Sequence, residues 1–133
     1  MIEQPFRYLS PVFFDELDPN AHLHNARFAV HIEHATTAAM SSWLAEAGRE
    51  GVDVRYAVRH FVISFQAPVR PQDDLIIELA RPRVGRTSAA WDFTCRRSTD
   101  QLTCATGART IVKIDEAGAA IPWPEDLRAA LSG

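Results

Sequence analysis

The chain has 133 residues, of which 47% are hydrophobic and 23% charged, a composition ordinary for a globular protein. This length predicts a single domain over residues 1–133 with a core of its own. The net charge of −3 argues against nucleic acid as the main partner, and no apolar run approaches the ~20 residues that cross a bilayer. The N-terminus lacks the basic-then-apolar pattern of a signal peptide, so we expect a cytoplasmic protein with no membrane partner.

The first part of the chain predicts a short strand, a polar loop and one long helix. Arg7 to Phe14 has the composition of a strand, and Pro11 implies an edge strand or a bulge. From Phe28 to Ala47, apolar residues recur with the 3.6-residue period of a helix. Asn25 suits the N-cap of this helix, and Gly48 suits the left-handed residue after its end. The many alanines would let the helix lie close against a sheet.

The rest of the chain alternates with a period of two, which predicts β-strands. Short turns separate these strands, and short connections favour antiparallel neighbours. The order predicts an α+β fold, with one long central helix wrapped by a curved antiparallel five-stranded sheet. The expected elements are strands at 56–67, 75–81, 88–97 and 102–114, a break at 82–86, a loop at 115–124 and a short helix at 125–131.

Two cysteines flank the predicted turn at residues 98–101. A two-residue loop at Thr99-Asp100 would set Cys95 opposite Cys104, so a cross-strand disulfide is conceivable. Two small hydrophobic thiols in neighbouring strands of a reduced cytoplasmic protein are the simpler interpretation.

The most informative segment is residues 12–35, where an apolar run ends in a turn containing Asp18. The predicted helix begins shortly afterwards, and His22, His24 and Asn25 lie between. A carboxylate just before a helix N-terminus can attack a carbonyl or activate water to attack it. The helix end can stabilise the negative charge that develops on the carbonyl oxygen.

Three segments carry a resemblance to a known family: FFDELDPNAHLHNARF, the turn APVRPQDDLIIE and GRTSAAWDF. Over roughly residues 7–115 the sequence resembles the hotdog-fold acyl-CoA thioesterases of the 4-hydroxybenzoyl-CoA thioesterase-like family. The resemblance implies a hotdog fold and hydrolysis of an acyl-CoA to free acid and CoA. It also implies that no cofactor or metal is needed, and that a homodimer or homotetramer holds the acyl chain between subunits.

The resemblance also implies roles for individual residues. Asp18 falls on the catalytic carboxylate, which acts as general base or as nucleophile. The backbone N–H of Asn25 falls on the amide that polarises the thioester carbonyl, and His22 falls on a position that is His in many members. Arg86 and Ser88 fall where the family often contacts the phosphates of CoA.

Three features leave alternatives open. The sequence has Asn20-Ala21 where many members have a Gly near the turn. Glu33 needs a partner or water in a mostly apolar helix, so it either faces a substrate cleft at a subunit interface or forms an exposed or ion-paired edge. The histidines at 22, 24, 31 and 34 invite a metal site, but they match neither the HExxH nor the Cys₂His₂ pattern, so we expect none.

Two other functions compete with thioester hydrolysis. A hotdog hydratase or dehydratase also uses Asp and His in a loop, typically as Asp-x-Asn-Pro-x-His. Here Asp18 and His22 are four residues apart and Pro19 precedes Asn20, which favours hydrolysis. A non-catalytic module that binds acyl-CoA or another small ligand is the second alternative.

Overall fold

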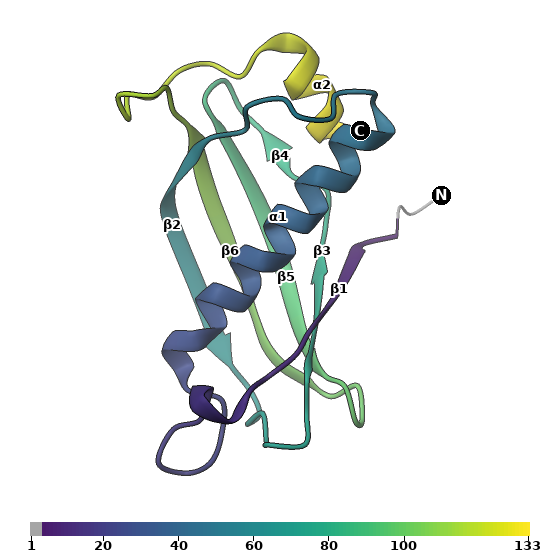
Figure 1. Ribbon diagram of the computed structural model, residues 1–133, viewed down its shortest axis with the longest axis vertical. Helices are drawn as coiled ribbons and strands as arrows, with labels where there is room; N and C mark the ends of the chain where they lie inside the picture. Colours follow the sequence, from purple (N-terminus) through teal and green to yellow (C-terminus); the bar gives the residue numbers. More distant parts are fainter. Residues whose placement is uncertain (1–3) are drawn as a thin grey trace.

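The computed structural model describes residues 4–133, in which one long helix lies across an antiparallel sheet (Figure 1). None of the helices in this part of the chain is long and apolar enough to cross a membrane. The strands are β1 (Phe6–Ser10), β2 (Tyr56–Phe65), β3 (Leu75–Leu79), β4 (Arg83–Val84), β5 (Ser88–Arg97) and β6 (Thr103–Lys113). The helices are α1 (Phe28–Glu46) and α2 (Glu125–Ser132), and the 3-10 turns are η1 (Phe14–Glu16) and η2 (Asn25–Arg27).

The strand order β1-β3-β5-β6-β2 leaves β1 and β2 at the two edges of an open sheet, and every pairing is antiparallel. This confirms the predicted fold of a single long helix wrapped by an antiparallel sheet. Within the segment predicted as a break, β4 adds a sixth strand of two residues that pairs with the start of β5.

The central helix follows its predicted pattern closely. It begins at Phe28 and ends at Glu46, one residue before the predicted end. Gly48 then adopts a φ of 70°, the left-handed conformation that glycine adopts without steric cost. One stripe of the helix is buried against the sheet, where Trp43 stacks on Trp91 of β5 with the ring centroids 6.4 Å apart.

The strands under the helix bury alternate residues, as a period of two requires. Trp91, Phe93 and Cys95 of β5 are all buried. Cys95 pairs with Ala105 and Arg96 pairs with Thr103, so Cys104 lies at the register shift between Cys95 and Arg96 and does not stand opposite Cys95. Both thiols are therefore buried and free, and burial raises the pKa of Cys104 to about 11.

The first predicted strand was wrong in its second half. β1 ends at Ser10, and the chain turns at Pro11 into η1. Proline has no N–H to donate to a ladder, so the pairing with β3 stops beside it. The predicted edge position of this strand is confirmed.

Candidate active site

The loop that joins η1 to the central helix is closed on itself at one end of the molecule (Figure 1). Leu17 and Leu23 form an isolated antiparallel bridge. Inside it, the Asp18 N–H donates to the His22 carbonyl at 2.7 Å, and the Ala21 N–H donates to the Asp18 carbonyl at 2.9 Å. These bonds fix the backbone on both sides of the Asp18 side chain.

Ala21 shows how the loop turns without a glycine. Its φ of 61° lies in the left-handed region, which costs a residue with a Cβ roughly 1–2 kcal/mol. The bonds on either side of Ala21 hold it in that conformation. The Asn20-Ala21 departure is therefore accommodated by local strain at Ala21.

The Asp18 carboxylate is held by backbone amides on one oxygen. Its Oδ1 accepts from the His22 N–H at 3.1 Å and from the Asn20 N–H at 2.9 Å. These bonds, that of His22 first, hold the pKa of Asp18 below its ordinary value, so the group is a carboxylate at neutral pH. No residue in the described part of the chain bonds to its Oδ2, which leaves that oxygen open to a water molecule or a substrate.

The start of the helix lies just beyond this loop. η2 begins at Asn25, and its cap is His24, whose Nδ1 accepts from the Ala26 N–H at 3.0 Å. The prediction that Asn25 is the N-cap was therefore wrong, because the His24 imidazole accepts the hydrogen bond from the Ala26 N–H. The Asn25 N–H has no partner within residues 4–133, so it is a free donor at the positive end of the helix.

One protomer does not bring all the predicted site residues together. His22 lies in the loop with Asp18, whereas Arg86 and Ser88 lie where β5 begins, beside β4 (Figure 1). The hairpin at the other end of β5 lies at the same end of the molecule as the loop. Ten strand residues span roughly 30 Å, so the Arg86 end is far from Asp18 within the same chain.

Glu33 makes contacts that account for its position in an apolar helix. Its Oε2 forms an ion pair with Arg109 of β6, and its Oε1 accepts from the Tyr56 hydroxyl at 2.9 Å. Arg109 is buried and also donates to the Thr36 hydroxyl at 3.2 Å. Burial, and then the contact with Glu33, raise the pKa of Tyr56. The contacts match the ion-paired alternative for Glu33.

A second polar cluster supports the loop and was missed in the sequence. His31 lies in the buried stripe of α1, with Ser10 Oγ 2.5 Å from its Nδ1 and a Glu16 oxygen 2.7 Å from its Nε2. The Glu16 carbonyl accepts from the His24 N–H at 2.9 Å. The signal in the sequence was a histidine within the apolar stripe of the helix. A buried imidazole needs polar partners, so such a histidine indicates a buried polar cluster.

The four histidines do not gather. His31 is enclosed by Ser10 and Glu16, and His24 caps η2. Among residues 4–133, no three His, Cys, Asp or Glu side chains lie close enough together to hold a metal ion.

A mostly apolar cavity of about 480 Å³ lies along the C-terminal half of α1. It is lined by one stripe of the helix, including Thr37, Met40 and Leu44, and by the chain that leads into β2, including Val52 and Tyr56. This cavity is at the end of the molecule away from Asp18.

Comparison with known proteins places this arrangement in a family. The sequence profile of the thioesterase-like superfamily matches residues 12–131, and the chain belongs to that superfamily. The hotdog fold predicted from the sequence is confirmed by its structural relatives. No functionally curated protein matches the sequence.

Three solved structures illustrate the likeness. A thioesterase from Thermus thermophilus, complexed with coenzyme A and zinc, has a TM-score of 0.80 at 23% identity, covering 98% of this chain and 100% of its own. The 1,4-dihydroxy-2-naphthoyl-CoA thioesterase Slr0204 from Synechocystis has a TM-score of 0.77 at 18% identity, covering 95% and 94%. The PA5185 protein from Pseudomonas aeruginosa has a TM-score of 0.80 at 19% identity, covering 97% and 90%. At these identities the likeness concerns the fold.

Proposed function

We propose that the protein is an acyl-CoA thioesterase that uses Asp18 to hydrolyse the thioester with water. The observation that carries this proposal is the pairing of an open carboxylate oxygen on Asp18 with a free N–H at Asn25, seven residues away at the start of the helix. Membership of the thioesterase-like superfamily supports the same reaction class. A structural relative complexed with coenzyme A supports CoA as the carrier of the acyl group.

In the proposed reaction, the thioester carbonyl oxygen accepts a hydrogen bond from the Asn25 N–H. Asp18 either removes a proton from an attacking water or attacks the carbonyl carbon itself to form an anhydride that water then cleaves. The positive end of the helix stabilises the oxyanion in both routes, and the thiolate of CoA leaves. His22 lies within the same loop, where its imidazole can supply a proton to the leaving sulfur. None of these steps requires a metal or a cofactor.

We further propose that the complete site forms between subunits. If β2 pairs antiparallel with the β2 of a second copy, the two protomers run in opposite directions. The partner subunit's Asp18 would then approach the end of this chain that carries the cavity and Arg86. In that arrangement the cavity takes the acyl group, and Arg86 and Ser88 contact the phosphates of CoA. Glu33 stays in its ion pair with Arg109 rather than contacting substrate.

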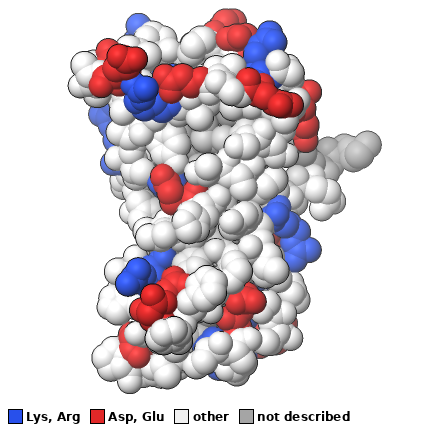
Figure 2. Space-filling model, viewed as in Figure 1, with Lys and Arg blue, Asp and Glu red and all other residues white. Residues whose placement is uncertain are grey.

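Two surface features support a homodimer or homotetramer. Val58, Val62 and Phe65 of the edge strand β2 are about half exposed, although they are apolar. The face over the middle of α1 is mostly uncharged, while charged side chains gather towards its two ends (Figure 2). Apolar edge residues beside a neutral face favour association with a second copy. The free thiols Cys95 and Cys104 fit a reducing cytoplasm.

A panel of acyl-CoA thioesters with aliphatic and aromatic acyl groups tests the proposal. The proposed function predicts catalytic release of free CoA thiol from at least one of them. Hydration of an enoyl-CoA without thiol release would show a hydratase instead. Saturable binding without turnover of any thioester would show a binding module.

A further inference from the structure

Asp18 lies in the segment of residues 12–23. The turn between β2 and β3, residues 68–74, contacts this segment at both of its ends. At the near end, Asp74 Oδ1 accepts from the Val12 N–H at 3.0 Å. The Asp74 backbone is itself fixed, since its N–H donates to the Ser98 hydroxyl at 2.8 Å and its carbonyl accepts from the Ser98 N–H at 3.0 Å. The Asp74 carboxylate therefore fixes the start of this segment, just after the end of β1.

The far end of the segment is held by the same turn. The Leu23 N–H donates to the Val69 carbonyl at 2.8 Å, and both side chains are buried. Leu23 directly follows His22, whose N–H bonds to the Asp18 carboxylate, and it lies two residues before Asn25. The position of the Val69 carbonyl therefore bears on both proposed catalytic groups.

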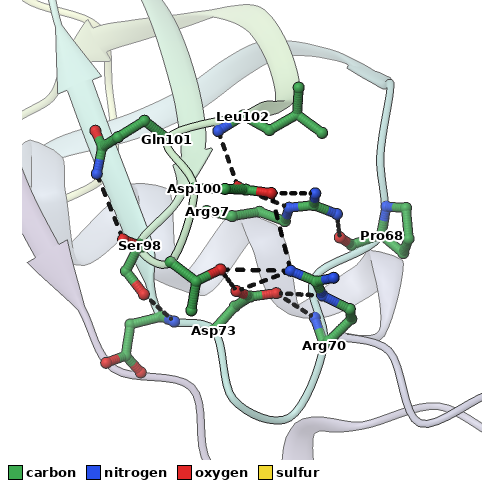
Figure 3. A network of polar contacts seen from close by, with 10 residues as sticks. Pro68, Arg70, Asp73, Arg97, Ser98, Asp100, Gln101 and Leu102 are labelled. Atoms are coloured by element: carbon green, nitrogen blue, oxygen red, sulfur yellow. Dashed lines mark hydrogen bonds and ion pairs between the residues drawn. The ribbon is translucent and has the colours of Figure 1, made fainter.

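Two charged side chains, Asp73 and Arg97, hold the residues on either side of Val69, which are Arg70 and Pro68 (Figure 3). Asp73, which is 1% exposed, accepts from the Arg70 N–H and from the Arg70 Nε, both at 3.0 Å, and from the Thr99 hydroxyl. Arg97 donates to the Pro68 carbonyl at 3.1 Å. Burial disfavours the charged form of Asp73, but the bonds from Arg70 and Thr99 lower the pKa of Asp73 and keep it ionised.

We propose that the adjacent aspartates Asp73 and Asp74 are positioning residues that clamp residues 12 and 23, and thereby aim Asp18 and the Asn25 N–H at the substrate. Asp74 holds Val12 directly, and Asp73 holds Leu23 through Arg70 and Val69. The proposal rests on the proposed function for its catalytic part. It gives the motif Arg70-Pro71-Gln72-Asp73-Asp74 a role in the reaction although none of its side chains touches the reacting atoms.

The test compares Asp73→Asn and Asp74→Ala with two controls. Asp92→Asn removes the charge of an exposed ion pair with Arg83, in the middle of β5 and away from the turn. Leu127→Ala removes a buried side chain from α2 and lowers stability far from the loop. Each variant is measured below its melting temperature for kcat and KM on the best thioester, and for hydrogen exchange in peptides that contain Leu23 and in peptides from β6.

A positioning role predicts that kcat falls roughly 10- to 100-fold in both clamp variants while KM changes less than about threefold. It also predicts exchange at least about tenfold faster at residues 17–25, with β6 unchanged. Both controls should keep kcat, including Leu127→Ala at matched loss of stability. Wild-type kcat in Asp73→Asn, or unchanged exchange at Leu23, would overturn the clamp. Faster exchange at Leu23 in a protein with no wild-type thioesterase activity would instead overturn the proposed function and support the clamp.

Discussion

The ion pair between Glu33 and Arg109 allows a sharp prediction about stability. Arg109 points from β6 into the space under the helix, and its side chain is 7% exposed. Its charge is met by Glu33, by the Thr36 hydroxyl and by the Tyr56 ring, whose centroid lies 5.8 Å from the guanidinium carbon. Replacing Glu33 with alanine removes the negative charge that offsets the cost of burying the Arg109 guanidinium. Replacing it with glutamine removes the charge but keeps an oxygen that can accept a hydrogen bond from the guanidinium.

The magnitude follows from how far each partner is buried. Removing one partner of a buried ion pair costs roughly 3–5 kcal/mol. The Glu33 side chain is 41% exposed, so water can reach the vacated position and reduce the cost towards that of an exposed pair, under ~1 kcal/mol. We expect Glu33→Ala to lower the free energy of unfolding by about 2–3 kcal/mol and Glu33→Gln by about 1–2 kcal/mol.

Urea unfolding at neutral pH measures these changes, and a double variant provides the control. Glu33→Ala combined with Arg109→Met should be more stable than Glu33→Ala alone, because no unpaired charge is left in the core. In both single Glu33 variants, kcat/KM should stay within about threefold of wild type below the melting temperature. An unchanged urea midpoint in Glu33→Ala would refute the reasoning. A large loss of kcat/KM at full stability would show that Glu33 contacts the substrate.

Three further predictions concern packing, pH and the CoA end of the substrate. Gly107→Ala places a Cβ 2.0 Å from the Val62 carbonyl oxygen, so thermal unfolding should show a loss of about 1–3 kcal/mol or more; an unchanged melting temperature would contradict this close approach. Because its amide bonds lower the pKa of Asp18, the base stays charged in mild acid, and kcat/KM should decline only below about pH 4 while the fold persists; a decline between pH 5 and 7 would assign the essential base to another group. Arg86→Ala should raise KM for an acyl-CoA by roughly 3–30-fold and spare kcat, since a phosphate contact is equal in ground and transition states. An equal effect on a truncated thioester without the nucleotide would remove the phosphate assignment.

The parts of the fold that were predicted correctly are those with strong local periodicity. The long helix begins at the predicted residue, where its apolar stripe starts, and ends within one residue of the predicted end, just before Gly48. The strand Ser88–Arg97 has the predicted bounds because alternation and flanking turns agree. Where periodicity and the residues that flank an element agree, its secondary structure can be predicted without knowledge of what it packs against.

The parts that were missed depend on contacts between distant residues. Asn25 and His24 can both cap a helix, and the 3-10 turn before α1 decides in favour of His24. The Glu16–His31 contact and the Asp74–Val12 bond join residues from separate elements, and no local pattern predicts either of them. The motif around Asp18 was recognisable because loop and helix start are adjacent in sequence. Arg86 lies just before β5, as the predicted break at 82–86 has it, but its distance from Asp18 appears only in three dimensions.

The central claim is that Asp18 performs the hydrolysis, and one substitution tests it most directly. Asp18→Asn keeps the shape of the side chain and an oxygen for the His22 and Asn20 amides, but it removes the base and nucleophile. Asp15→Asn, an exposed carboxylate in the same segment, is the matched control. We predict that CoA thiol release falls roughly 10²–10⁴-fold in Asp18→Asn and stays near wild type in Asp15→Asn. Near wild-type release in Asp18→Asn would contradict the account.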